Sequence, residues 1–151
     1  MKSLYRIHPH WAHRAAATLA ACLLGSGHAM AGNPAWTQDR TSEALHTVGR
    51  PVSVVFKPDA AMQLNMPVNA VVTHVYAARR FDSTAQISTQ LCHGLTGGPC
   101  VPLQGSHINT GRFDGQAATG PWRLVHKVLG WGNDHPPVFV RDTIIVWYTA
   151  P

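Results

Sequence analysis

Acidic residues and cysteines are scarce in this chain of 151 residues. It has one glutamate, Glu43, six aspartates and three cysteines. The aspartates all lie at predicted turns or loops, where capping of the backbone accounts for them without an active site. The chain has neither a G-x-S-x-G nucleophile motif nor the C-x-x-C pair of a thioredoxin-like redox site. We therefore predict a protein that is not an enzyme and that uses no cofactor.

Basic residues and histidines are present, but not in the patterns that nucleic acid or metal binding requires. The only adjacent basic pair is Arg79-Arg80, and no basic stripe occurs, so we expect no nucleic-acid partner. Six histidines follow residue 31, and no two of them have the short spacing that presents a pair of metal ligands from one element. We therefore expect no specific metal site.

Residues 1–31 have the pattern of an export signal. Three basic residues and no acidic residue lie in 1–14, an apolar run covers 15–24, and the A-x-A motif at Ala29 and Ala31 predicts cleavage after Ala31. The apolar run is shorter than the roughly 20 residues that cross a bilayer, and no later run approaches that length. We expect a periplasmic or extracellular protein with no stable membrane span in the mature chain.

An alternative for the same segment is a lipoprotein signal. Residues 19–22 read Leu-Ala-Ala-Cys, so Cys22 would become the acylated first residue of the mature chain. Against this, the apolar run continues through Leu24 and the A-x-A motif follows it.

Cleavage after Ala31 leaves 120 residues with nine basic and seven acidic side chains, a net charge of +2 and enough length for one domain.

The sequence pattern of the mature chain is typical of an all-β protein. β-branched and alternating residues predict strands at 52–56, 68–80, 85–92, 101–103, 121–129, 138–140 and 143–149. Residues 32–50 are expected to wrap the surface with Trp36 in a groove, 105–120 to form a loop, and Arg141-Asp142 to break the last two strands. The interpretation is a single antiparallel β-sandwich of immunoglobulin-like type over 51–151.

Cys92 and Cys100 enclose a turn rich in glycine and proline, with the sequence HGLTGGP between them. Glycines that accept positive φ, between two segments of alternating residues, favour a hairpin closed across its mouth. An oxidising compartment allows two such cysteines to pair. We predict a structural disulfide.

Two loops are candidates for contact with a partner. One has Trp131 between glycines with Asn133 nearby, and the other, 105–120, has Arg112 and Phe113. Tryptophan is enriched at the energetic centres of interfaces. The alternative is that Trp131 folds back onto its own sheet.

Several stretches together resemble the flagellar protein FlhE family. They are residues 91–92 and 100–106 around the two cysteines, 67–73 leading into 76–81, the closing stretch 139–148, and Ala35-Trp36. The resemblance implies a periplasmic, non-enzymatic β-domain protein associated with the flagellar type III export apparatus. It further implies a role in swarming and in limiting proton leakage through the export gate.

The chain departs from the FlhE pattern in a longer turn between the cysteines and in the loop 131–137, which leaves the partner surface open. The alternative function is a periplasmic β-sandwich binding module for a small ligand, a metal or another envelope protein, like a pilus chaperone or a copper carrier. In either case we expect a monomer that contacts the export apparatus or another envelope protein.

Overall fold

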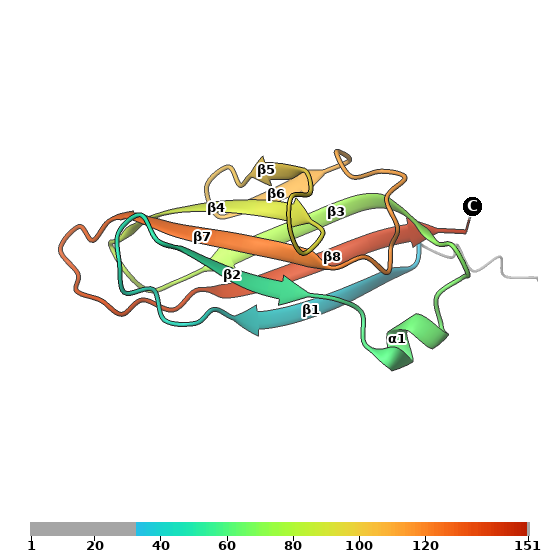
Figure 1. Ribbon diagram of the computed structural model, residues 1–151, viewed down its shortest axis with the longest axis horizontal. Coiled ribbons are helices and arrows are strands. Elements are labelled where there is room, and N and C mark those ends of the chain that lie inside the picture. Colours follow the sequence, from blue (N-terminus) through green and yellow to red (C-terminus); the bar gives the residue numbers. More distant parts are fainter. Residues whose placement is uncertain (1–32, 151) are drawn as a thin grey trace, which may run out of the picture. The chain divides into compact units, whose positions relative to one another are not determined.

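Two antiparallel β-sheets of four strands each make up the computed structural model, which describes residues 33–150 (Figure 1). The elements are β1 (Ala35–Thr41), β2 (Pro51–Phe56), α1 (Ala60–Leu64), β3 (Val71–Arg80), β4 (Gln86–His93), β5 (Cys100–Pro102), β6 (His107–Thr110), β7 (Trp122–Gly130) and β8 (Arg141–Thr149). The predicted export signal, with Ala29, Ala31 and Cys22, lies outside the described residues. Within 33–150, no helix has the length and apolar character needed to cross a membrane.

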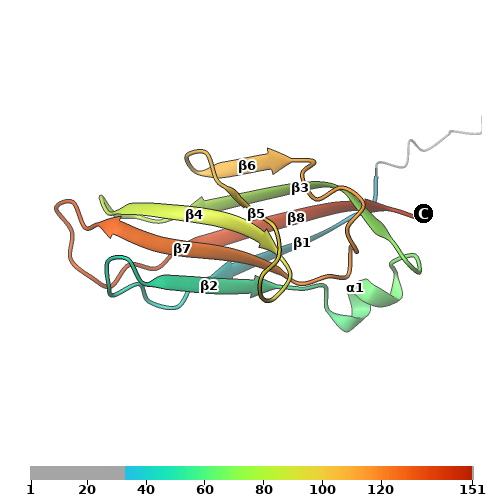
Figure 2. The ribbon, with the colours of Figure 1, turned by 45° about the horizontal axis from the view of Figure 1, so that its top comes forward.

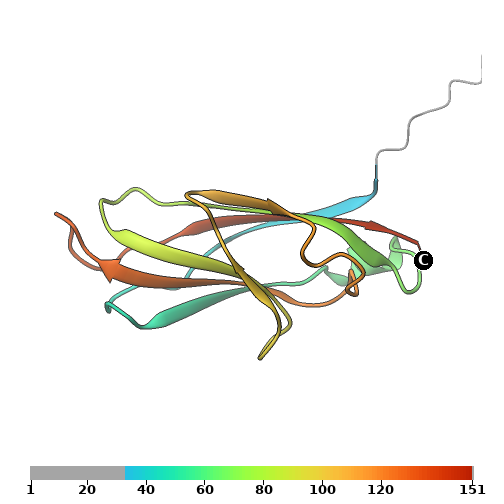
Figure 3. The same ribbon diagram turned by 90° about the horizontal axis from the view of Figure 1, so that it is seen from above.

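The strand order is β1-β8-β3-β6 in one sheet, here the β8 sheet, and β2-β7-β4-β5 in the other, the β7 sheet. Only the connection from β4 to β5 stays within a sheet. Figures 2 and 3 show β1 and β8 in one layer and β2 and β7 in the other. The predicted all-β antiparallel sandwich with a hairpin disulfide is confirmed. Its strand order is that of a double-sheet jelly roll, which joins its strands differently from the immunoglobulin domain.

The core lies between the sheets and forms because side chains along a strand point alternately to the two faces. On the central strand β7, every second residue from Trp122 to Val128 is buried, and on β8 the same holds from Asp142 to Tyr148. The buried apolar side chains form two clusters. The larger includes Trp122, Phe113 and Leu124, and the smaller includes Leu45, Val128 and Val140.

The segment 32–50 departs from its expected role as a surface wrap. Residues 35–41 form the edge strand β1, paired antiparallel with β8 from Ala35 opposite Trp147 to Thr41 opposite Arg141. Trp36 is buried in the larger cluster, and its Nε1 donates a hydrogen bond to the carbonyl of Ala118 at 3.1 Å. The expectation was wrong because Trp36 is the only buried residue of β1. The strand therefore lacks the alternation of apolar and polar residues by which a strand is recognised in a sequence.

Strand β3 contains a bulge between Val72 and His74. Because one extra residue moves the following side chains to the opposite face, Val75, Ala77 and Arg79 join Val72 on the inner face, and Tyr76 points outward. In a regular strand without the bulge, alternation would place Val72 and Tyr76 on the same face.

Two further segments correct the expected strands. Residues 107–110, within the predicted loop 105–120, form the short edge strand β6 beside β3. Arg141 and Asp142 begin β8 and do not interrupt it. Strand β6 is hard to recognise from composition because Ile108 is its only apolar residue. The start of β8 is hard to recognise because two adjacent charged residues resemble a turn.

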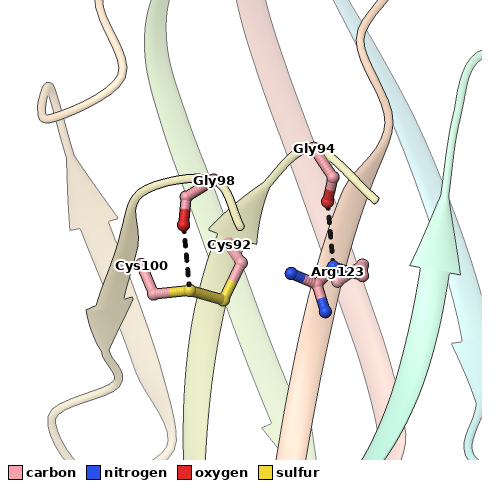
Figure 4. Close-up of a disulfide and its surroundings, with 5 residues drawn as sticks. All are labelled: Cys92, Gly94, Gly98, Cys100 and Arg123. Atoms are coloured by element: carbon pink, nitrogen blue, oxygen red, sulfur yellow. Dashed lines mark hydrogen bonds between the residues drawn. A yellow bond between two sulfur atoms is a disulfide. The ribbon is translucent and has the colours of Figure 1, made fainter. Parts of the chain in front are cut away.

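The disulfide joins β4 to β5, where Cys92 and Cys100 lie directly opposite each other with Cα atoms 4.1 Å apart (Figure 4). Gly94 has a φ of +92°, and a Cβ on Gly98 would lie 1.6 Å from the His93 carbonyl oxygen, so the turn requires glycine at both positions. Arg123 Nε donates to the Gly94 carbonyl at 2.9 Å. Cys100 Sγ lies 3.6 Å from the Gly98 oxygen, a contact without a hydrogen bond because a disulfide sulfur carries no hydrogen.

Removing the disulfide with the variant C92A/C100A is expected to lower the free energy of unfolding by about 2–3 kcal/mol, since the cross-link restricts the unfolded chain over a short loop. Urea denaturation with and without reductant measures this. Reduced wild type should unfold at the same urea concentration as the variant. An unchanged midpoint on reduction would contradict a stabilising bridge.

Candidate functional site

The residues predicted for partner contact lie at opposite ends of β7. Arg112 and Phe113 precede this strand in the β6–β7 loop, and Trp131 and Asn133 follow it in the β7–β8 loop (Figure 1). The structure therefore does not bring the two pairs together into one surface.

Phe113 is 1% exposed and packs edge-on against Trp122, with ring centroids 4.9 Å apart. Its loop folds back onto the start of β3, where Gly115 N donates to the Val72 carbonyl at 2.9 Å. The prediction that Phe113 contacts a partner is therefore wrong: a lone aromatic in a polar loop here fills the core. The adjacent Arg112 is exposed, and its role stays a prediction.

The β7–β8 loop is attached to the end of the sandwich by hydrogen bonds to Thr84. Asn133 N donates to Thr84 Oγ1 at 3.1 Å, and Thr84 donates to Asp134 through both its backbone N and its hydroxyl. Hydrogen bonds from the Thr84 backbone, and next from the side chains of Ser83 and Thr84, hold the pKa of Asp134 below its ordinary value. Trp131 packs, partly buried, against the smaller core cluster, and Asn133 is exposed. Much of the indole therefore folds back, and Asn133 stays a candidate contact.

Four polar side chains meet between the two sheets, and we call them the inter-sheet cluster: Arg79, Thr89, His126 and Asp142. His126 and Asp142 are 0% and 1% exposed, and their Nε2 and Oδ2 atoms lie 2.8 Å apart. His126 Nδ1 lies 2.9 Å from Thr89 Oγ1. Arg79 donates from Nη1 to Thr89 Oγ1 and to the Ile87 carbonyl, each at 2.5 Å. The cluster thus joins β3 and β8 to β4 and β7.

One tautomer of His126 satisfies the hydrogen bonds of the cluster. Thr89 Oγ1 accepts from Arg79 and can donate its own hydrogen to His126 Nδ1. In this tautomer Nδ1 is an acceptor, and Nε2 carries the proton that it donates to Asp142. Burial raises the pKa of Asp142 above its ordinary value, although the interaction with His126 and the charge of Arg79 oppose this. Burial likewise lowers the pKa of Arg79, against the attraction of Asp142.

The order Thr89, His126, Asp142 resembles a catalytic triad, but its placement does not suit one. A nucleophilic hydroxyl must reach a substrate, and Thr89 is 3% exposed and already bonded to Arg79. In the inter-sheet cluster these groups therefore hold the sheets together. Over residues 33–150, no three His, Cys, Asp or Glu side chains are grouped to hold a metal ion.

A groove of about 640 Å³ lies on the outer face of the β8 sheet. We call it the arginine groove. Its walls come from β1, β3, β8 and the start of β6, chiefly from Tyr76, Ala78, Arg80, His107, Arg141 and Thr143. Four arginines and two aspartates line it in all; Arg79 and Asp142 belong to the inter-sheet cluster, and the remaining Arg40, Arg80, Arg141 and Asp39 give the groove a positive charge.

Arg80 and Arg141 lie directly opposite each other on β3 and β8. Both are exposed, and neither makes an ion pair, since the one ion pair within residues 33–150 joins His126 to Asp142. The nearby Asp39 instead accepts a hydrogen bond from the Thr143 hydroxyl. Like charges directly opposite in a sheet are destabilising. The groove thus contains two arginines that make no ion pair and whose backbone positions are neighbours across β3 and β8.

Sequence reasoning missed both the inter-sheet cluster and the arginine groove. The sequence did contain a signal for the inter-sheet cluster. His126 lies between Leu124 and Val128 at one of the alternate positions of β7 whose side chains are buried. Its partner Asp142 was hidden because the Arg141-Asp142 pair resembles a turn. The groove depends on which face of β3 points outward, and the bulge at Val72/His74 decides that.

The fold defines a class of protein, a disulfide-closed β-sandwich with the strand order of a jelly roll. The crystal structure of FlhE is similar, with a TM-score of 0.58 and 24% identity over 78% of this chain and 98% of the FlhE chain. The predicted likeness to FlhE is thereby confirmed for the fold. The structure of Desmodium yellow mottle tymovirus covers 100% of this chain at 11% identity, but its TM-score of 0.30 is too low to support an argument. No protein-family model and no curated protein sequence matches the chain.

Replacing His126 with leucine is expected to lower the free energy of unfolding by about 3–5 kcal/mol, because it leaves the buried Asp142 carboxylate without its main partner. Urea denaturation at pH 7 measures the loss. H126L/D142L should lose less than the sum of H126L and D142L. K127L, at the neighbouring exposed position, is the control and should change the value by about 0.5 kcal/mol or less. Additive losses would show that the two side chains are not coupled.

Replacing Asp142 with asparagine is expected to change how stability depends on pH. Because the folded pKa of Asp142 is raised, the folded state holds its proton more tightly than the unfolded state. The stability from this proton is fully present below the ordinary pKa of about 3.9 and is lost as pH rises through the raised value. The unfolding free energy of wild type minus that of D142N should therefore fall from pH 4 to pH 7. A difference that stays constant or rises would contradict the raised pKa. Urea denaturation at each pH measures it, and D82N, which changes an exposed aspartate, reports the background.

Proposed function

We propose that the protein is a non-enzymatic accessory protein of the flagellar type III export apparatus that acts in the periplasm. The observation that carries the proposal is the likeness in fold to FlhE, which extends over 98% of the FlhE chain. The sequence resemblance points to the same family from separate evidence, the stretches around Cys92 and Cys100 and at 139–148.

The resembling stretches belong to the framework of the sandwich. Residues 100–106 include β5 and half of the disulfide, and 139–148 include most of β8, an inner strand of its sheet. Their likeness therefore supports a shared framework and leaves the surface that contacts the partner free to differ. The disulfide supports an oxidising compartment such as the periplasm.

The finer role that we propose is support of flagellar assembly and swarming, with restriction of proton leakage through the export gate. A rigid, disulfide-closed sandwich suits a protein that acts by contact. An export signal at residues 1–31 would deliver the chain to the periplasmic side of the gate. Partner contact through Arg112 and Asn133, both exposed, belongs to this proposal.

Deletion of the gene is expected to impair swarming and to lower cytoplasmic pH in flagellated cells, because protons would leak inward through the gate. Swarm diameter and a cytoplasmic pH-sensitive fluorescent protein measure the two effects. The full chain should restore both, whereas a chain without residues 1–31 should restore neither because it would stay in the cytoplasm. Normal swarming and normal pH in the deletion strain would refute the flagellar role and favour the alternative, a periplasmic binding module for a ligand or another envelope protein.

A further inference from the structure

We propose that the arginine groove binds an acidic, extended segment of a partner protein, with a carboxylate held between Arg80 and Arg141. This inference concerns a site of the free protein and does not depend on a flagellar role.

The first argument is the unpaired charge. Arg80 and Arg141 are register partners on adjacent strands, so their guanidinium groups start from neighbouring backbone positions on one face. This arrangement costs stability in the free protein. A carboxylate between the two arginines would replace the repulsion between them with charge-assisted hydrogen bonds. The planar guanidinium group of arginine can donate two parallel hydrogen bonds to the two oxygens of a carboxylate.

The second argument is what adjoins the arginines. Ala78 and Tyr76 continue the same outer face of β3, both half-buried, and the His107 ring lies beside Tyr76 with centroids 6.0 Å apart. The positive end of the groove therefore passes into an apolar and aromatic floor. A peptide carries acidic and apolar side chains on one strand and fits such a floor.

The groove does not suit a nucleic acid. A phosphodiester backbone needs a continuous positive track, whereas here Asp39 lies on β1 across from the arginines and the floor beyond them is uncharged. A lipid headgroup or free phosphate would use the arginines but leave the aromatic floor unoccupied. Only the peptide uses both parts.

The spacing sets the form of the peptide. Arg80 and Tyr76 are four residues apart on one face, about 13 Å along the strand. An extended peptide places its side chains on one face at every second residue. The segment should therefore carry a glutamate or aspartate two to four residues from an aromatic residue.

The test uses the blocked heptapeptide Thr-Phe-Thr-Glu-Thr-Glu-Thr and a matched peptide with glutamine in place of both glutamates. Titration calorimetry with the protein lacking residues 1–31 measures affinity, and amide NMR shifts locate the contact. We expect the acidic peptide to bind, with shifts on β3 and β8, and the glutamine peptide to bind at least tenfold more weakly. Raising the salt concentration should weaken binding of the acidic peptide.

Two double variants separate the groove from general charge. R80Q/R141Q should weaken binding of the acidic peptide at least tenfold, while R50Q/K127Q, with the same loss of charge at exposed sites outside the groove, should change it less than twofold. R80Q/R141Q should keep or raise the melting temperature, because it removes a repulsive pair. Equal weakening by both doubles, equal binding of both peptides, or tighter binding of inorganic phosphate or phosphatidylglycerol vesicles than of the acidic peptide would overturn the proposal.

Discussion

The hydrogen bond between His126 and Asp142, 2.8 Å long and fully buried, is the interaction on which the rest of this sandwich depends. It joins β7, an inner strand of one sheet, to β8, an inner strand of the other. A buried carboxylate is costly unless it is paired; His126 provides the pairing, and the charge of Arg79 also favours the carboxylate. Apolar clusters lie on either side of this polar bridge, so the core combines non-directional burial with one directional contact that fixes how the sheets face each other.

The same bridge has a consequence on the outside of the molecule. Neighbouring residues on a strand point to opposite faces, so placing Arg79 and Asp142 inward places Arg80 and Arg141 outward. These two then lie opposite each other across β3 and β8. The inter-sheet cluster and the arginine groove therefore lie on opposite faces of the same strands. In the sequence pair Arg79-Arg80, the first residue lies in the core and the second on the surface. In the pair Arg141-Asp142, the first residue lies on the surface and the second in the core. The bulge in β3 sets which member of the first pair enters the core.

The likeness to FlhE concerns the framework. Stretches that resemble FlhE in sequence form β5 and most of β8, and the similar crystal structure has the same fold at 24% identity. Burial constrains such strands more strongly than it constrains loops, so a shared framework persists where contact surfaces diverge. Trp131, Asn133 and Arg112 belong to loops, where this chain can differ from FlhE, whereas Tyr76, Arg80 and Arg141 of the arginine groove lie in stretches that resemble FlhE.

The sequence by itself determined the all-β class, most strand positions and the Cys92–Cys100 pair, because alternation, β-branched residues and turn glycines act locally. It did not determine the jelly-roll order, the edge strands β1 and β6, or the burial of Phe113, because each depends on what packs against the segment from far along the chain. The inter-sheet cluster shows the reason most clearly. Thr89, His126 and Asp142 are 37 and 16 residues apart in sequence, and only the stacking of the two sheets makes them hydrogen-bonding neighbours.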